Sequence, residues 1–269
     1  MSPHVVGSTL TDWQIRNPNL RWPVELPGSL RGARVLSVTR RAKYLLLGFQ
    51  EGALIIHLGM SGSLRIITDP IEPPRKHDHV DLLFAGNKVL RLNDPRRFGS
   101  MHWQPHPVME HWLLSALGPE PLGKDFTGSY LKSRARKRRV AVKNLIMDSH
   151  VVVGVGNIYA NEALFLAGLR PTLRASRITQ KGYSRLVAAI QRVLGDAIEM
   201  GGTTLRDFVN QDGNPGYFKQ SLNVYGRERQ PCRVCGSSLR GARIGQRATV
   251  YCPSCQSSQG FSGRAWDGA

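Results

Sequence analysis

Acidic residues are scarce in this chain. Among its 269 residues there are 19 Asp and Glu against 37 Lys and Arg, which gives a formal net charge of +18 and a pI near 10.5. An excess of positive charge on this scale favours an anionic macromolecule as the partner over small-molecule chemistry built on carboxylates.

Long apolar runs are absent as well. No stretch approaches the roughly 18 consecutive apolar residues that a membrane span requires. The N-terminal residues also lack the charged start, apolar run and small-residue cleavage site of a signal peptide. We therefore expect a cytoplasmic protein that makes no contact with a membrane.

Only four cysteines occur, in the pattern C-x2-C-x16-C-x2-C: Cys232, Cys235, Cys252 and Cys255. Because the cytoplasm keeps thiols reduced, metal ligands are favoured over disulfides, and four thiolates leave no open coordination position. We expect one structural zinc ion, four unliganded cysteines being the alternative. Arg240, Arg243 and Arg247 lie between the two pairs without any acid, which predicts a basic hairpin that contacts phosphate.

The composition allows a folded protein of more than one domain. Hydrophobic residues make up 41% of the chain, which permits a real core and excludes wholesale disorder. The length exceeds the roughly 100–200 residues usual for one domain and predicts two. Residues 210–219 (NQDGNPGYFK) indicate a loop whose aromatic side chains can stack on a flat surface. The Ser/Gly-rich tail after Gln256 is predicted to be disordered.

The pattern along the chain predicts strands first and helices later. Short β-type runs indicate a sandwich or barrel in the N-terminal part: residues 35–39, 44–49, 53–58, 64–67, 80–84 and 89–92. Gly118–Asp125, rich in Pro and Gly, marks a domain boundary. Beyond it, apolar residues recur with helical spacing from Leu186 to Ile198. A shorter helix is expected from Asn157, whose side chain is predicted to cap it, to Gly168.

Between residues 132 and 143 there are seven Lys and Arg and no carboxylate: Lys132, Arg134, Arg136, Lys137, Arg138, Arg139 and Lys143. A solvated helix face, which is the alternative interpretation, usually mixes charges of both signs. The absence of counter-charges favours a polyanion, because neutralising phosphates releases counterions. We therefore predict a nucleic-acid partner.

Two further features point to chemistry. Lys43 falls in an apolar strand stretch, where desolvation could lower its pKa and make it a proton donor or nucleophile. A lysine that extends from a strand edge is the alternative. The turn DPRRFG (residues 94–99) presents a guanidinium beside an aromatic ring, which suits insertion into a base stack. Asp-Pro is also a common turn opener, and Phe98 could instead belong to the core.

Together these stretches resemble one family, the bacterial formamidopyrimidine-DNA glycosylases, which are related to endonuclease VIII. The resemblance rests on RRAKYLLL (40–47), IIHLGMSGSLR (55–65), KHDHVDL (76–82), DPRRFG (94–99), LGPEPL (117–122), VVGVGNIYANEALF (152–165), GGTTLRDF (201–208), DGNPGYF (212–218), and the CRVCG and QRATVYCPSC motifs of the finger. These motifs extend over nearly the whole chain, so the resemblance is far more specific than any single motif.

The resemblance implies an α+β multidomain protein that binds duplex DNA in a cleft between its halves. It implies an N-terminal β-sandwich (1–117), a helix-two-turn-helix domain (118–222), a zinc finger with a β-hairpin (223–256) and a disordered tail (257–269). It also implies a monomer of the bacterial cytosol and nucleoid. Such an enzyme removes oxidised purines, such as 8-oxoguanine and formamidopyrimidines, and cleaves the abasic site by β,δ-elimination.

The resemblance also assigns roles to individual residues. In this family the damaged purine is flipped out and three side chains fill the gap, at positions matched by Met60, Arg96 and Phe98. Positions that contact the DNA backbone are matched by His77, Arg96, Arg138, Lys143, Asn157 and Arg247; at Arg138 the family usually has lysine. Lys43 matches the residue of β-elimination and Arg247 that of δ-elimination. The loop 210–219 matches the segment that folds over the flipped base.

The chain departs from the family at its start. The family begins M-P-E-L-P-E-V-E and uses the amine of that proline as nucleophile and the next glutamate as acid. This chain begins Met1-Ser2-Pro3-His4, its first acid is Asp12, and the first helix of the sandwich is expected to be missing. A start codon assigned too far downstream is one interpretation, and a non-catalytic protein that binds lesions or nicked duplex DNA is the other. A zinc-ribbon protein that binds RNA fits the charge but not the gap-filling residues.

Overall fold

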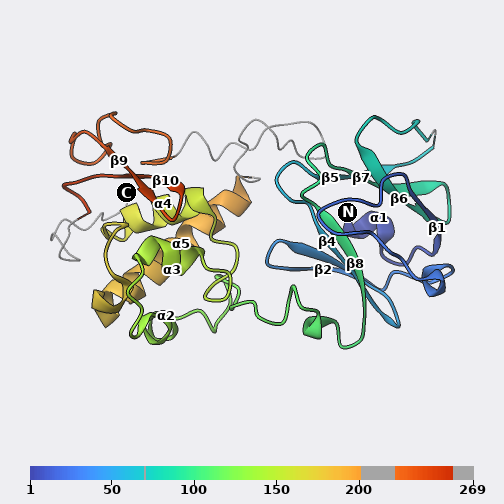
Figure 1. The fold of residues 1–269 in the computed structure, drawn as a ribbon, viewed down its shortest axis with the longest axis horizontal. Helices are drawn as coiled ribbons and strands as arrows, with labels where there is room; N and C mark the ends of the chain where they lie inside the picture. Colours follow the sequence, from blue (N-terminus) through green and yellow to red (C-terminus); the bar gives the residue numbers. More distant parts are fainter. Residues whose placement is uncertain (70, 201–221, 257–269) are drawn as a thin grey trace. The chain divides into compact units, whose positions relative to one another are not determined.

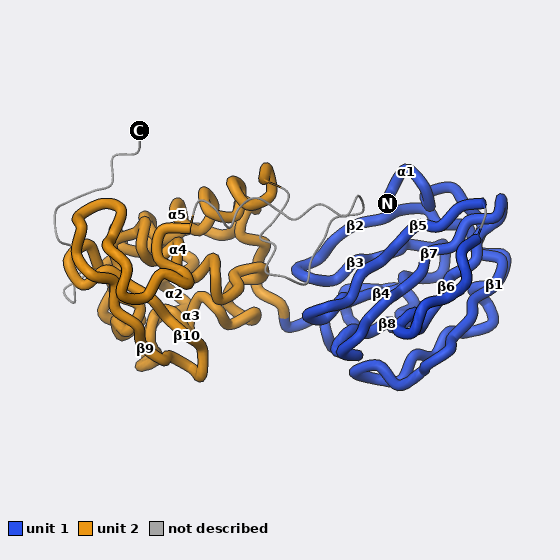
Figure 2. The backbone as a smooth tube through the Cα atoms, turned by 90° about the horizontal axis from the view of Figure 1, so that it is seen from above, with its two compact units in different colours: residues 1–116, 206–214 blue, residues 117–205, 215–269 orange. Residues whose placement is uncertain are grey.

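The computed structural model describes residues 1–69, 71–200 and 222–256. They divide into two compact units, unit 1 with Met1–Ala116 and unit 2 with the described residues from Leu117 onward (Figure 2). The predicted loop at 210–219 and the predicted disordered tail at 257–269 lie outside the described residues.

Unit 1 is a sandwich of two antiparallel four-stranded sheets, as predicted, with the strand orders β1-β6-β7-β5 and β2-β3-β4-β8 (Figure 1). Its strands are β1 (Leu10–Ile15), β2 (Ser37–Arg41), β3 (Tyr44–Gly48), β4 (Gly52–His57), β5 (Ser63–Ile67), β6 (Asp78–Phe84), β7 (Lys88–Asn93) and β8 (Ser100–Pro105). Short helices complete the unit: α1 (Ser2–Val5), η1 (Gly28–Leu30) and η2 (Val108–Glu110).

The core of unit 1 lies between the sheets, because each sheet turns one apolar face inward. Leu82 of β6 and Leu54 of β4 are both fully buried and belong to one cluster of apolar side chains. Alternation of this kind is what made most of the strands predictable. Strands β1 and β8 were missed because polar residues dominate them, Leu10 being the one fully covered apolar residue of β1.

The other face of the sheet β1-β6-β7-β5 carries a buried network of ion pairs. Asp81 accepts hydrogen bonds from Nε and Nη2 of Arg91, each at 2.8 Å, and also pairs with Arg16. Asp78 accepts a hydrogen bond from Nη2 of Arg65 at 2.8 Å. Burial acts to raise the pKa of both carboxyls, but hydrogen bonds hold each pKa below its usual value: from Arg91 and Arg16 side chains at Asp81, and from a backbone N–H and side chains at Asp78. Both carboxylates are therefore charged at neutral pH.

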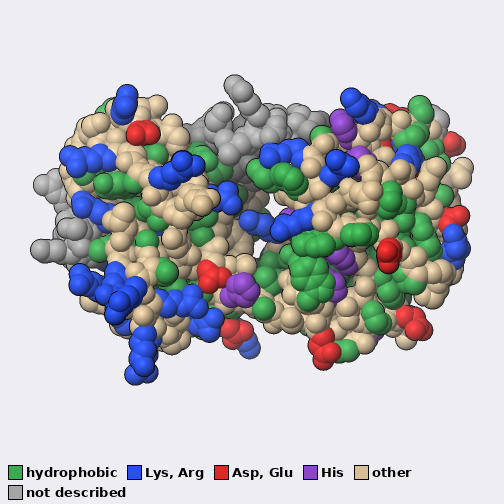
Figure 3. Space-filling view, viewed as in Figure 1, with side chains coloured by type: hydrophobic (Ala, Val, Ile, Leu, Met, Phe, Trp, Pro, Cys, Tyr) green, Lys and Arg blue, Asp and Glu red, His purple; other side chains and the backbone are tan. Residues whose placement is uncertain are grey.

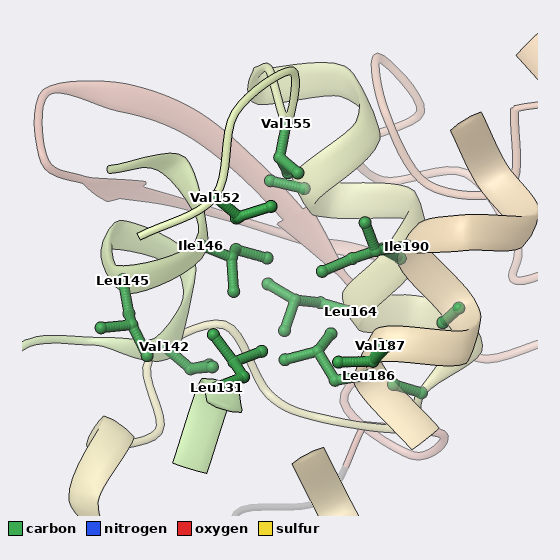
Figure 4. Packing of buried hydrophobic residues seen from close by; sticks show 14 of the residues in the cluster. Leu131, Val142, Leu145, Ile146, Val152, Val155, Leu164, Leu186, Val187 and Ile190 are labelled. Atoms are coloured by element: carbon green, nitrogen blue, oxygen red, sulfur yellow. The ribbon is translucent and has the colours of Figure 1, made fainter. Parts of the chain in front are cut away.

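Unit 2 packs helices around one apolar core. Its elements are α2 (Gly128–Ala135), α3 (Val142–Met147), α4 (Asn157–Leu166), η3 (Ala175–Arg177), α5 (Gln180–Glu199) and a hairpin of β9 (Arg240–Ile244) and β10 (Arg247–Tyr251). Side chains from the four α-helices point toward one another in Figure 4, among them the fully buried Leu131, Ile146, Leu164 and Leu186.

Both predicted helices of unit 2 are present, and the shorter one begins at Asn157 as predicted, but its cap differs from the prediction. The run from Leu186 to Ile198 lies in α5, which is capped by Thr179, whose Oγ1 accepts a hydrogen bond from Gly182 N at 3.1 Å. Helix α4 has Gly156 at its N-cap and no capping side chain, so the prediction that Asn157 caps it was wrong. None of the helices in the described residues combines the length and hydropathy of a membrane-spanning segment.

Candidate nucleic-acid interface

The four cysteines come together in unit 2 and form the predicted zinc site. Their Sγ atoms all lie within 4.8 Å of one another, with Cys235 and Cys252 3.5 Å apart and Cys232 and Cys255 3.9 Å apart. Tetrahedral Zn–S bonds of about 2.3 Å separate the sulfurs by roughly 3.8 Å, so the cluster fits one zinc ion. Four protein ligands make this ion structural.

The second cysteine pair is tied to the helices of unit 2 by Gln256, which is fully buried. Its Oε1 accepts a hydrogen bond from Cys252 N at 2.8 Å, and its Nε2 donates to Leu169 O at 2.9 Å. Zinc binding and helix packing therefore share one hydrogen-bond network.

The segment that enters the finger is held by Glu162 of α4. Its carboxylate, on a residue only 2% exposed, accepts hydrogen bonds from the backbone N–H groups of Asn223 at 2.8 Å, Val224 at 2.9 Å and Tyr225 at 2.9 Å. Charge-assisted bonds of this kind are stronger than neutral ones, so this carboxylate fixes where the finger begins.

The β9-β10 hairpin is held against α4 along the edge of β10. Asn157 Nδ2 donates to Ala248 O at 3.1 Å, and Asn161 Oδ1 accepts from Val250 N at 2.9 Å. Asn157 and Asn161 lie one turn apart on the same face of α4, and this spacing is close to that between Ala248 and Val250, which are alternate residues on the edge of β10. The exposed Arg247 begins β10, so the two asparagines of α4 help to fix its position.

Lys143 of α3 contacts the same strand and is fully buried. Its Nζ donates to Ala248 O at 3.0 Å and to Thr249 Oγ1 at 2.6 Å. Burial, together with the nearby positive charge of Arg247, lowers the pKa of Lys143 to about 8. These two hydrogen bonds use two of the three N–H donors of the Lys143 ammonium, and its contact with the DNA backbone stays a prediction.

The basic run 132–143 extends from the second half of α2 through the turns after it to the start of α3. Lys and Arg side chains gather over this part of unit 2 in the face that Figure 3 shows. Lys132 Nζ donates to Ile178 O, and Arg138 Nη1 pairs with Asp148 Oδ2 at 3.2 Å. The run itself contains no acidic residue, but Asp148, in a later turn, provides a counter-charge for Arg138. The exposed members include Arg136, Lys137 and Arg139.

In unit 1, two loops carry the residues predicted to fill the gap left by a flipped base. Met60, between β4 and β5, is 55% exposed, and Phe98, in the turn before β8, is 43% exposed. The Arg96 guanidinium lies 4.9 Å from the centroid of the Phe98 ring. Gly59 lets the loops touch, because a Cβ on it would lie 2.6 Å from the Phe98 carbonyl carbon.

Below these loops lies Asp94, which is fully buried. Its backbone N–H donates to His77 O at 3.0 Å, and its backbone carbonyl contacts His79 Nε2 at 2.9 Å. His77 is half-buried, and its ring lies 6.3 Å from that of His79. The structure therefore brings His77, Arg96, Phe98 and Met60 into one region of unit 1.

Lys43 lies in the turn between β2 and β3 and not in a strand, so that prediction was wrong. Ala42 has a φ of +54° in this turn, and Arg41 pairs with Tyr44 across it. Lys43 is exposed, so the desolvation expected from the sequence does not occur. Its charge reaches His57, whose pKa is lowered by burial and then by Lys43.

Comparison with known proteins identifies the fold. The N-terminal domain of formamidopyrimidine-DNA glycosylase matches residues 1–101, its H2TH domain matches 117–209, and the zinc finger found in FPG and IleRS matches 229–257. The formamidopyrimidine-DNA glycosylase of Methylococcus capsulatus is 58% identical over 258 residues, which cover 95% of each chain. The chain belongs to the formamidopyrimidine-DNA glycosylase family. The Hahella chejuensis glycosylase is 54% identical over 95% of each chain.

Solved structures of this family show the same architecture. The MutM (Fpg) protein from Thermus thermophilus has a TM-score of 0.82 and 37% identity, covering 94% of this chain and 93% of that one. Lactococcus lactis Fpg in complex with DNA containing an abasic site has a TM-score of 0.85 and 29% identity, covering 95% and 94%. The same protein in complex with DNA containing Fapy-dG has a TM-score of 0.84 and 29% identity, and the match covers 95% of each chain.

The residues that sequence reasoning missed are buried and polar. Asp94, Asn161 and Glu162 hold the segments on which the glycosylase-family motifs lie, yet none was singled out. Asn161 and Glu162 stand inside an otherwise apolar helical stretch, which is a signal for buried polar groups with backbone partners. Asp94 opens a turn and gives no such signal, because its partner Gly99 lies in that turn and its other partner, Ser61, lies on a separate loop.

Proposed function

We propose that this protein is a bifunctional DNA glycosylase and apurinic/apyrimidinic lyase that removes oxidised purines, such as 8-oxoguanine and formamidopyrimidines, from duplex DNA. Family membership over 95% of the chain carries this proposal. DNA containing Fapy-dG or an abasic site, bound by the Lactococcus lactis relative, represents the substrate and the intermediate that we propose here. The proposed setting is the bacterial cytoplasm and nucleoid, with the protein acting as a monomer.

In this proposal, unit 1 enters the duplex where the damaged nucleotide leaves. Unstacking costs a few kcal/mol for each base step, and side chains inserted into the gap offset part of that cost. Met60 and Phe98 provide apolar surface, and Arg96 adds a charge that is already stacked on Phe98. His77 contacts a neighbouring phosphate.

Unit 2 supplies the proposed contacts with the backbone. Arg247 begins β10, and Asn157 bonds to the next residue, Ala248. Arg138 exchanges its partner Asp148 for a phosphate. Lys143 contributes indirectly, by fixing Ala248 and Thr249 next to Arg247. The proposed chemistry follows the family: an amine of the protein forms a Schiff base with the sugar, Lys43 assists β-elimination, and Arg247 assists δ-elimination.

Borohydride trapping tests this function directly. The 269-residue protein is mixed with a duplex that carries one 8-oxoguanine opposite cytosine, and the products are separated on a denaturing gel. With borohydride we expect a covalent protein–DNA band, and in a parallel reaction without borohydride we expect a cut strand with phosphate at both new ends. Peptide mapping of that band identifies the reacting amine. Specific binding with neither a band nor a cut would contradict the proposal and favour a lesion-binding protein.

Replacing Arg247 with Ala is expected to separate the two elimination steps. Proton transfer by a positioned side chain contributes about a hundredfold or more in rate, so δ-elimination should slow by about that factor while β-elimination continues. The ratio of the two cleavage products on a sequencing gel measures this. Arg243→Ala, on β9 of the same hairpin, is the control and should leave the ratio unchanged.

DNA affinity is expected to fall steeply with salt. The logarithm of the association constant falls linearly with the logarithm of the salt concentration, and each neutralised phosphate adds about −0.9 to the slope. Lys137→Ala, in the exposed basic run, should reduce this slope by about 1, as measured by fluorescence anisotropy. Lys88→Ala in β7 is the control, because its amine already donates to His4 O and Ser8 Oγ. An unchanged slope in Lys137→Ala would show that Lys137 does not neutralise a phosphate and would contradict the placement of the basic run at the DNA interface.

A further inference from the structure

Asp94 connects the two loops of unit 1 that carry the gap-filling residues. Its Oδ1 accepts a hydrogen bond from Ser61 Oγ at 3.2 Å, and its Oδ2 accepts one from Gly99 N at 2.7 Å. Ser61 follows Met60 in the loop between β4 and β5, whereas Gly99 follows Phe98 in the turn before β8. One carboxylate therefore touches both loops directly behind their exposed side chains.

The carboxylate is itself held in place from a third segment. The backbone N–H of Asp94 donates to His77 O, and His79 Nε2, on a residue 6% exposed, contacts Asp94 O at 2.9 Å. The turn closes when Arg97 N donates to Asp94 O at 3.2 Å. Asp94, which directly follows β7, is thus anchored through its backbone to the start of β6.

The loop of Met60 also meets the turn through its backbone. Gly59 has a φ of +65°, and a Cβ there would collide with the backbone of Phe98 and Gly99. Its N–H donates to His57 Nδ1 at 3.0 Å, which holds the start of the loop against β4. With Gly59 fixed on one side and Ser61 bound to Asp94 on the other, the backbone of Met60 is restrained from both directions.

We propose that Asp94 is a positioning residue that joins Met60 to Arg96 and Phe98 in one preformed wedge. This inference rests on the proposed function, in which these side chains enter the duplex. Exposed loops lose conformational freedom when they bind, and a group that orders them beforehand lowers that cost. The buried carboxylate does this through charge-assisted hydrogen bonds, which are stronger than neutral ones. Asp94 itself touches no DNA in this scheme.

Three variants test the inference: Asp94→Ala, Ser61→Ala and Asp94→Asn. Hydrogen exchange of the free protein reports order in residues 58–62 and 95–99 without any DNA. Insertion of the wedge is followed by the fluorescence of 2-aminopurine next to an abasic site in a duplex. The single-turnover cleavage rate is measured on that duplex and on the same abasic site in single-stranded DNA, which needs no wedge.

Loss of a hydrogen bond to a charged group should reduce the 2-aminopurine signal and the duplex rate in Asp94→Ala by about tenfold. The single-strand rate should stay within about twofold. Ser61→Ala should speed exchange in residues 58–62 and show a smaller loss of duplex rate. Asp94→Asn should fall between the native protein and Asp94→Ala, because an amide can accept from Gly99 N and donate to Ser61 Oγ but lacks the charge of the carboxylate.

Unchanged exchange in both loops, or a native duplex rate in folded Asp94→Ala, would overturn the inference. If Asp94→Ala fails to fold, Ser61→Ala decides, since it removes one surface-side link only. Equal losses on duplex and single-stranded DNA would also overturn the inference. If the native protein does not cleave the duplex, the proposed function is wrong. If the native protein cleaves it and the variants behave as described above, only the positioning role of Asp94 is wrong.

Discussion

Replacing Cys232 with Ser is expected to release the zinc ion and unfold the finger. Structural zinc contributes about 10–16 kcal/mol of apparent binding free energy in small finger peptides, and this becomes folding free energy. Three remaining thiolates cannot close the tetrahedral site. The consequences should spread through Gln256 to Leu169, because that side chain connects Cys252 to the helices. We expect loss of bound zinc, weakened DNA binding and a lower melting temperature.

Atomic absorption for zinc, anisotropy for DNA affinity and circular dichroism for melting measure the three effects. Ser238→Ala is the matched control, because Ser238 is an exposed residue of the same finger and makes only a long hydrogen bond to Arg229 O. Native affinity in a zinc-free Cys232→Ser protein would show that Arg247 does not depend on the finger for its position.

Replacing Asp81 with Ala is expected to destabilise unit 1 severely. The change leaves the side chain of Arg91, only 3% exposed, without its two short hydrogen bonds to a carboxylate. Breaking a buried pair by removing one partner costs about 3–5 kcal/mol, whereas whole domains have about 5–15 kcal/mol of stability. Urea unfolding followed by tryptophan fluorescence checks this result. Asp12→Ala, which breaks the exposed pair with Arg31, should leave the midpoint nearly unchanged.

The same network predicts how unit 1 responds to acid. The pKa values of Asp78 and Asp81 are lowered in the folded protein, so folding favours their charged forms. The stability that they contribute is complete above the unfolded pKa of about 3.9 and is lost as pH falls below it. The urea concentration at the midpoint of unfolding of the native protein should therefore decrease when the pH is lowered below about 4. In Asp81→Ala this drop should be smaller, because one of the two titrating groups is gone.

The fold followed from the sequence wherever a local pattern decides the structure. The alternation of strands such as β6 and the helical spacing in α5 are properties of neighbouring residues, and so is the spacing of the cysteines. Strand β8 escaped prediction because its place in the sheet depends on pairing with β4, which is distant along the chain. Sequence alone also placed Lys43 in a strand, since the tight turn at Ala42 contains neither Gly nor Asn.

The site was predictable for exposed residues and less so for buried ones. Met60, Arg96, Phe98 and Arg247 are exposed, as a direct contact with DNA requires. Lys143 matched a family position by residue type, yet its environment is set by Thr249 and Ala248, more than a hundred residues later in the chain. A single sequence does not report such distant partners, so it could not distinguish a lysine that meets phosphate from one that holds a strand.

The attachment of the hairpin to α3 and α4 has a consequence for synthesis. The ribosome completes α3 and α4 before it makes residues 222–256, so Lys143, Asn161 and Glu162 emerge ahead of every hairpin or finger group to which they bond. Until the finger closes around zinc, the nascent helices hold a lysine, an amide and a carboxylate that cannot be buried without cost. We therefore expect a shortage of zinc during translation to prolong the exposure of the newly made helices to chaperones and proteases.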